Sequence, residues 1–177
     1  MLKNLSLLSI LFILAACGFH LRGVAGSYSF PYKTVMLDCG TPVICPGFKK
    51  AIMAESLTTL VTKKESAEAV VVVSNEQTSR DTMDFNSVGQ ISSYILTYQI
   101  TARVYTPQGD QIGDDIVVKN QQIMNFNNSL VLSAQQQEDA SWDLIHQNVI
   151  NGLIRRLVYF HSQLMTNYAP ESGQVVK

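Results

Sequence analysis

Three cysteines are the residues of this 177-residue chain best placed to do chemistry, and the first of them ends a distinctive N-terminal segment. The segment opens with one basic residue, Lys3, and continues with an apolar run from Leu5 to Leu14. Two small residues follow, and Cys17 comes directly after them. A basic start, an apolar run of about 7–15 residues and a small-residue cleavage site are typical of a secretory signal. The run is too short for a membrane span, which needs roughly 20 apolar residues.

The four residues Leu14-Ala15-Ala16-Cys17 resemble the lipobox of bacterial lipoproteins. The resemblance implies that the Cys17 thiol is alkylated with diacylglycerol, that the signal is cut just before it, and that the new amine is acylated. Each buried methylene of such chains contributes about 0.8 kcal/mol, so two or more chains hold a protein firmly on a membrane. Gly18, rather than Asp, follows the cysteine, which in such lipoproteins points to the outer membrane. The alternative is an ordinary signal peptide with a chance cysteine at its end.

Cys39 and Cys45 are separated by five residues that include a glycine and a proline. In an oxidising compartment an even pair of cysteines favours a disulfide. Closing so short a loop would contribute about 2 kcal/mol. Two free thiols are the alternative, whereas a metal site would need further ligands, and no His or Cys lies close by in the sequence. We therefore predict a Cys39–Cys45 disulfide and no metal site.

Known catalytic patterns are absent from the sequence. There is no G-x-S-x-G, no H-E-x-x-H and no glycine-rich phosphate loop. The three histidines are scattered, and Asp143 and His146 at i, i+3 are more often a surface pair than a catalytic dyad. A net charge of −1 gives no basic footprint for nucleic acid. We therefore expect neither an enzyme nor a cofactor-binding protein.

Composition bounds the organisation of the chain. After the signal, about 160 residues are enough for one domain with a core. The charged fraction of 15% is low for a soluble protein, where about 25% is usual, and neutral polar residues replace the missing charges. Such a surface suits a large partner or a wet lumen, although a compositional bias of the species explains it equally well. The expected segments are a lipoprotein signal peptide at 1–16, a lipidated linker at 17–31, a single domain at 32–166 and a disordered tail at 167–177.

Hydrophobic patterning predicts the secondary structure. Residues 92–106 are the clearest strand, because large apolar residues alternate with polar ones such as Thr97, Gln99 and Thr101. The apolar stripe from 46 to 63 predicts a helix, and a longer amphipathic helix follows a capping box at Ser133. The remaining expected elements are strands at 34–38, 69–80 and 116–126, a polar loop or ragged hairpin at 81–89 and a hairpin turn at 107–110.

The resulting order is β-α-β-β-β-α. Both helices have one apolar stripe, and the best strand has one apolar face. The economical packing is an α+β fold with two helices on one face of a mixed, roughly four-stranded sheet. The opposite face of the sheet is then expected to be polar and exposed.

Several segments resemble the LptE family of lipopolysaccharide-assembly lipoproteins. The head of the mature chain, Cys17-Gly18-Phe19-His20-Leu21-Arg22-Gly23, carries the resemblance directly after the lipobox. Further matches are Ser66-Ala67-Glu68-Ala69-Val70 at the start of a strand, Gly89-Gln90 before the long strand, and the Leu-Ile-Arg-Arg-Leu pattern that ends at Leu157. The expected order of elements is also consistent with the family over nearly the whole mature chain.

The resemblance implies a non-enzymatic role at the outer membrane. LptE-like proteins sit as a plug inside the LptD barrel and contact lipopolysaccharide, which they help to place in the outer leaflet. A ligand with phosphates should seek basic side chains, so Arg80, Arg103 and Lys119 on the strands are candidate contacts. Solvated charges that keep strands from aggregating explain these residues equally well. The alternative function is a periplasm-facing lipoprotein that scaffolds another envelope complex without binding glycolipid.

Overall fold

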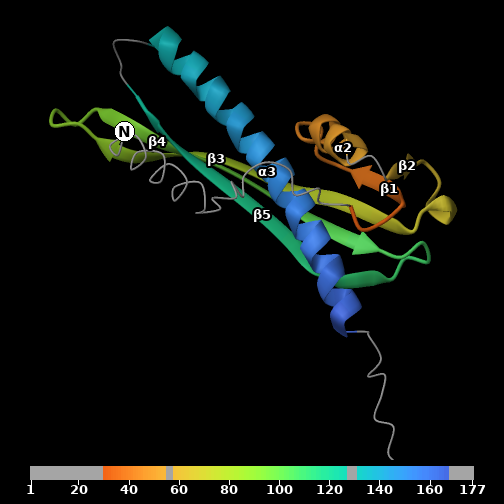
Figure 1. Cartoon of the computed structure of the whole chain (residues 1–177). Coiled ribbons are helices and arrows are strands. Elements are labelled where there is room, and N and C mark those ends of the chain that lie inside the picture. The colour runs from red at the N-terminus through yellow and green to blue at the C-terminus, as the bar shows by residue number, and fades with distance from the viewer. Residues whose placement is uncertain (1–29, 55–57, 127–130, 168–177) are drawn as a thin grey trace, which may run out of the picture.

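A computed structural model of the chain describes residues 30–54, 58–126 and 131–167 (Figure 1). The predicted signal peptide at 1–16, the predicted lipid-attachment residue Cys17, the predicted linker up to residue 29 and the predicted tail beyond residue 167 lie outside the described residues. No helix within the described ranges is both long enough and apolar enough to cross a membrane.

The described chain forms one mixed sheet with two α-helices packed on one of its faces, which confirms the predicted α+β class (Figure 1). The strands lie in the order β2-β1-β3-β4-β5; β1 pairs in parallel with β2 and β3, while β3, β4 and β5 are antiparallel. The elements are β1 (Thr34–Cys39), α2 (Cys45–Ala54), β2 (Thr59–Val61), η1 (Lys64–Ser66), β3 (Ala69–Phe85), β4 (Ile91–Tyr105), β5 (Gln111–Asn125) and α3 (Val131–Asn167).

The sheet has five strands rather than the expected four, because the first α-helix is shorter than its apolar stripe. Helix α2 ends at Ala54, and the strand β2 occupies residues that we assigned to the helix. Residues 58–62 include three threonines and a valine, and β-branched residues favour strands. The Thr58 hydroxyl donates to the carbonyl of Tyr32, and the Thr59 N–H donates to the carbonyl of Lys33. These bonds bind the segment to the start of β1.

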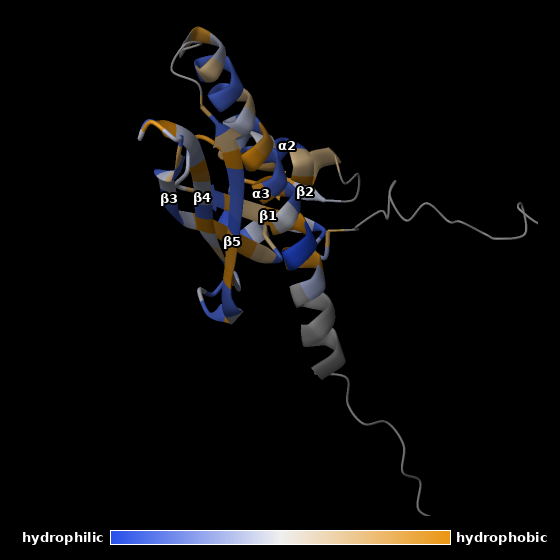
Figure 2. Ribbon diagram, turned by 90° about the vertical axis from the view of Figure 1, so that its left-hand side faces the viewer, coloured by the Kyte–Doolittle hydropathy of each residue, from blue (hydrophilic) through white to orange (hydrophobic). Residues whose placement is uncertain are grey.

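The core lies between the sheet and its two helices, and Figure 2 shows apolar and polar residues alternating along the strands. The alternation predicted for the long strand is confirmed, since its even-numbered residues from Leu96 to Val104 are buried beneath α3 and α2. Helix α3 contributes a stripe with three- and four-residue spacing: Ile145, Val149, Leu153 and Leu157. The core therefore follows directly from the period of two in the strand and 3.6 in the helix.

A β-bulge in β3 decides which side chains face the helices. Ser74 pairs with Thr101 and Gln77 with Gln99, so two residues of β3 lie opposite one residue of β4. Asn75 in the bulge has φ 55°, a left-handed conformation that asparagine tolerates better than most residues. Before the bulge the odd-numbered residues of β3 face the helices, and after it the even-numbered ones do. Arg80 consequently faces α3.

Candidate interaction surface

The sheet face opposite the helices is polar over its middle, as the sequence predicts. In register across β3, β4 and β5 lie the two rows Gln77-Gln99-Lys119 and Ser79-Thr97-Gln121. The Gln99 amide donates to Gln77 Oε1 at 3.4 Å, and the Gln121 amide donates to Thr97 Oγ1 at 2.9 Å. We call these six residues the polar face. It offers neutral donors and acceptors and one cation.

One member of the expected polar set is not on the surface. Thr101 is buried where β4 passes between Ser74 and Val117, and the Ser74 hydroxyl has no hydrogen-bond partner among the described residues. The polar face therefore begins one residue pair beyond the bulge, at Gln99, and not at Thr101.

Arg103 lies beside the polar face but is held by a neighbouring strand. Its guanidinium donates two hydrogen bonds to the Asp115 carboxylate, at 2.7 and 2.6 Å. The hydrogen bonds from Arg103 hold the pKa of Asp115 below its usual value, while the Asp115 carboxylate raises the pKa of Arg103. A bidentate pair of this kind holds the guanidinium in a fixed orientation through two parallel hydrogen bonds. A phosphate would have to compete with Asp115 for this arginine.

Arg80 lies on the helix side of the sheet, apart from Arg103 and Lys119. Its guanidinium lies 3.3 Å from the Glu138 carboxylate on α3, and its Cζ lies 4.1 Å from the centre of the Tyr94 ring. These contacts bind the start of α3 to the outer part of β3 and β4. The structure therefore does not gather the three predicted basic residues into one site. Lys119 alone makes no ion pair with any residue that the structure describes.

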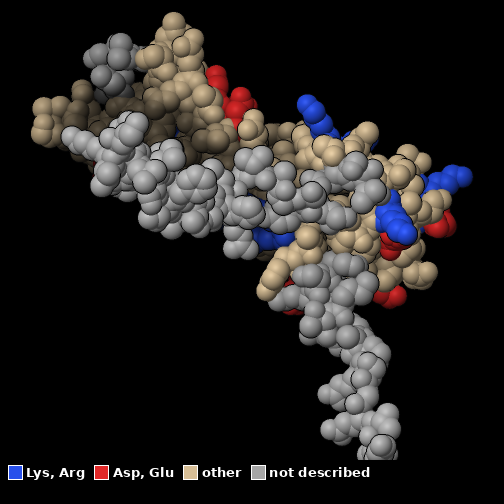
Figure 3. Space-filling view, viewed as in Figure 1, with Lys and Arg blue, Asp and Glu red and all other residues tan. Residues whose placement is uncertain are grey.

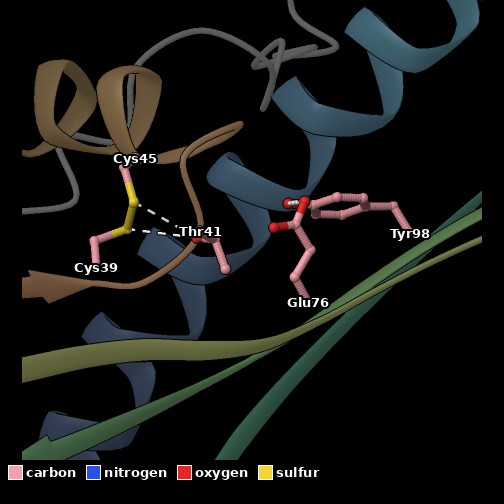
Figure 4. The surroundings of a disulfide bond; sticks show 5 residues. All are labelled: Cys39, Thr41, Cys45, Glu76 and Tyr98. Atoms are coloured by element: carbon pink, nitrogen blue, oxygen red, sulfur yellow. Dashed lines mark hydrogen bonds between the residues drawn. A yellow bond between two sulfur atoms is a disulfide. The ribbon is translucent and has the colours of Figure 1, made fainter.

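A cluster of aromatic and charged groups lies on the helix side. The Tyr98 hydroxyl donates to Glu76 Oε1 at 2.9 Å (Figure 4). The Tyr98 ring packs edge-on against His146 of α3. The His146 ring also stacks on Trp142. Burial, followed by the hydrogen bond from Tyr98 to the Glu76 carboxylate, raises the Tyr98 pKa. The cluster fixes α3 on the sheet.

Stability should fall on mild acidification because of His146. Burial lowers the His146 pKa below its ordinary 6.5, although Asp143 and Glu76 partly oppose this effect. The unfolded chain therefore binds a proton more readily than the folded one as the pH falls through 6.5. Urea unfolding at pH 7.5 and pH 5.5 should show a loss of stability that is smaller in His146→Phe, which keeps an aromatic ring but does not titrate. Equal losses in both proteins would contradict this role.

Cys39 and Cys45 form a disulfide between the end of β1 and the first residue of α2 (Figure 4). The Thr41 hydroxyl lies 3.5 Å from each sulfur atom. The two cysteines also line an open groove of about 750 Å³, whose other walls include Met36, Leu60 and Lys49. None of the three predicted basic contacts lines this groove.

We expect the Cys39–Cys45 bond in protein isolated from an oxidising compartment. Both cysteines lie between Lys33 and Lys49, so one tryptic peptide holds them. Mass spectrometry should find that this peptide takes up an alkylating reagent only after reduction, and two free thiols would contradict the prediction. The Cys39→Ser/Cys45→Ser variant should lose about 2 kcal/mol of unfolding free energy, because a short loop is released. The native protein treated with a reductant is the matched control.

The described residues contain no group of three or more His, Cys, Asp or Glu side chains placed to hold a metal ion. The sheet offers one open surface for recognition, the polar face, because the two helices cover the apolar face on the other side.

Comparison with known proteins gives the family. The sequence profile of the LptE family, described as lipopolysaccharide-assembly, matches residues 47–157, which is more than half of the chain. The chain therefore belongs to the LptE family. No curated protein matches it in sequence.

Solved lipoprotein structures share the fold. Lipoprotein B from Nitrosomonas europaea superposes with a TM-score of 0.71 at 17% identity, covering 85% of this chain and 97% of the other. A minor lipoprotein from Acinetobacter baumannii gives 0.61 at 15% identity, with 73% and 93% covered. Rare lipoprotein B from Shewanella oneidensis gives 0.58 at 11% identity, with 76% and 97% covered. At these identities the likeness concerns the fold.

Proposed function

We propose that this chain is an outer-membrane lipoprotein that assembles as a plug with a large LptD-like β-barrel and helps to insert lipopolysaccharide into the outer leaflet. Membership of a lipopolysaccharide-assembly family supports the general role. We propose further that it is not an enzyme, that it needs no cofactor, and that the acyl chains on Cys17 place it on the membrane.

The polar face is the observation that carries the plug role. Five of its six side chains are neutral hydrogen-bonding groups. Enclosing a charged group away from water is costly unless it is paired, whereas amides and hydroxyls can exchange water for the groups of a lumen wall. A face of this composition can be enclosed in a wet lumen at modest cost.

Lys119 is the candidate for contact with a phosphate of the glycolipid, since Arg80 and Arg103 already have carboxylate partners. Purified lipopolysaccharide carrying a photoactivatable group should label the native chain more strongly than Lys119→Ala. Lys50→Ala, an exposed lysine on α2, is the matched control and should be labelled like the native chain. Equal labelling of all three proteins would remove Lys119 from the proposed contact.

Copurification tests the barrel partner. The tagged chain, isolated from detergent-solubilised envelopes, should bring with it a large outer-membrane barrel in a constant ratio. If it instead brings a periplasmic complex without a barrel, the chain is a scaffold of another assembly. If it purifies alone, the proposed function is wrong.

A further inference from the structure

The hairpin between β3 and β4 ends in a cluster of exposed apolar side chains. Met83, Phe85 and Val88 are 47%, 63% and 75% exposed, and Figure 2 shows apolar residues at this end of the sheet. The hairpin projects past α3 and leaves every residue from Arg80 to Gln90 exposed. We call residues 83–90 the tip. Exposed apolar residues that are clustered, rather than scattered singly, mark interaction sites.

The tip has a fixed conformation. The Asn86 N–H donates to the Gln90 carbonyl at 2.7 Å, and Asn86 Oδ1 accepts hydrogen bonds from the N–H groups of Val88 and Gln90. Gly89 has φ 78°, where a side chain would be strained. These bonds define the backbone of the turn, and the Val88 side chain projects from it 75% exposed. An apolar group fixed in this way binds with little loss of conformational entropy.

The negative charge around the tip indicates what kind of partner the tip can bind. The Asp81 and Asp84 carboxylates accept hydrogen bonds from Ser79 and Ser93, and neither forms an ion pair with a described residue. The tip contains no Lys or Arg, and Arg80 is held by Glu138 on the helix side. In Figure 3 no basic side chain is visible at the tip end of the face shown. Uncompensated carboxylates disfavour an anionic glycolipid or bilayer and favour a partner with basic residues.

We infer that the tip docks into an apolar pocket of a partner protein, and that Lys or Arg side chains border this pocket and face Asp81 and Asp84. Taking that partner to be the barrel rests on the function proposed above. The polar face and the tip then have different roles: the polar face meets a wet wall, whereas Phe85 and Val88 are the anchors that give the contact its position.

Photo-crosslinking and copurification test the inference on the full tagged chain in cells. A benzoylphenylalanine at Val88 should capture the barrel, whereas one at Gln108 should capture it less. Gln108 is a fair control because it lies exposed in the other hairpin turn, which is closed by a similar bond from Thr106 to Asp110. Phe85→Ser/Val88→Ser should reduce the copurified barrel about tenfold, as expected when two buried anchors are truncated.

Three further variants and an unfolding measurement separate specific docking from loss of folding and from non-specific hydrophobic binding. Met53→Ser removes a 59%-exposed apolar side chain on α2 and should leave the yield of barrel unchanged. Asp84→Lys should lower the yield more than Asp84→Asn, because only the lysine would repel basic residues. The urea midpoints of the Phe85→Ser/Val88→Ser and native domains should agree, since both replaced side chains are exposed in the free domain.

The outcomes distinguish the inference from the function on which it rests. If the native chain and Phe85→Ser/Val88→Ser yield the same amount of barrel, the inference is wrong and the proposed function stands. If the native chain yields no barrel, the proposed function is wrong, and the barrel is not the docking partner of the tip. A fluorophore on a Val88→Cys variant should be unaffected by vesicles of phosphatidylethanolamine and phosphatidylglycerol; a blue shift would overturn the inference in favour of a lipid-facing tip.

Discussion

Replacing Leu153 with alanine should lower the unfolding free energy of the domain by about 3 kcal/mol, the largest effect that we expect from one side chain in the core. Leu153 is completely buried on α3. Its neighbour Gly152 lies so close to β5 that a Cβ there would be 3.0 Å from the Val118 side chain, so the helix has little room to move into a cavity. A domain of this kind is stable by only about 5–15 kcal/mol, so the loss is a large fraction of the total.

Urea denaturation of the two domains measures this loss. Leu144→Ala is the matched control, because Leu144 is an exposed leucine on the same helix and its removal should change stability by no more than about 0.5 kcal/mol. Equal losses in the two variants would mean that α3 does not pack on the sheet through the stripe that contains Leu153.

Replacing Cys17 with alanine should leave the signal attached or the protein unlipidated. The thiol is the group through which the predicted lipobox would attach diacylglycerol. Each methylene that the acyl chains bury contributes about 0.8 kcal/mol to membrane binding. Summed over two or more chains, this contribution far exceeds what a single surface contact supplies.

Metabolic labelling with a palmitate analogue measures the effect of this change. The native chain and a Cys39→Ala variant should both incorporate label, and Cys17→Ala should incorporate none. Undiminished label in Cys17→Ala would contradict the lipobox interpretation, and loss of label in Cys39→Ala would mean that the assay reports folding and not lipid attachment.

Long periodic segments made most of the fold predictable. The alternation through residues 92–106 and the stripe along α3 identify the two buried faces directly, because each segment repeats its pattern many times. Strand β2 was missed because three residues hold too little pattern to compete with the apolar stripe of the helix before it. Its position depends on bonds to residues 32 and 33, which are distant in the sequence.

The candidate site was less predictable than the fold, and the bulge in β3 is the physical reason. Unbroken alternation from Val71 and Val73 would place Arg80 on the open face with Lys119. One extra residue reverses the sides of β3 beyond Gln77, so Arg80 meets Glu138 on α3. The signal that could have revealed this is Asn75, a residue type that tolerates left-handed conformations, at the change from β-branched to polar residues.

Site-specific crosslinking from the polar face tests the central claim most directly. A photo-crosslinker at Gln121, or at Gln99 in the neighbouring strand, should capture a large outer-membrane barrel in intact cells, while one at Gln174 in the predicted tail should capture it less. Enclosure of the polar face in a barrel lumen predicts this order. A domain that purifies alone from intact envelopes, with no barrel adduct from Gln99 or Gln121, would contradict the account.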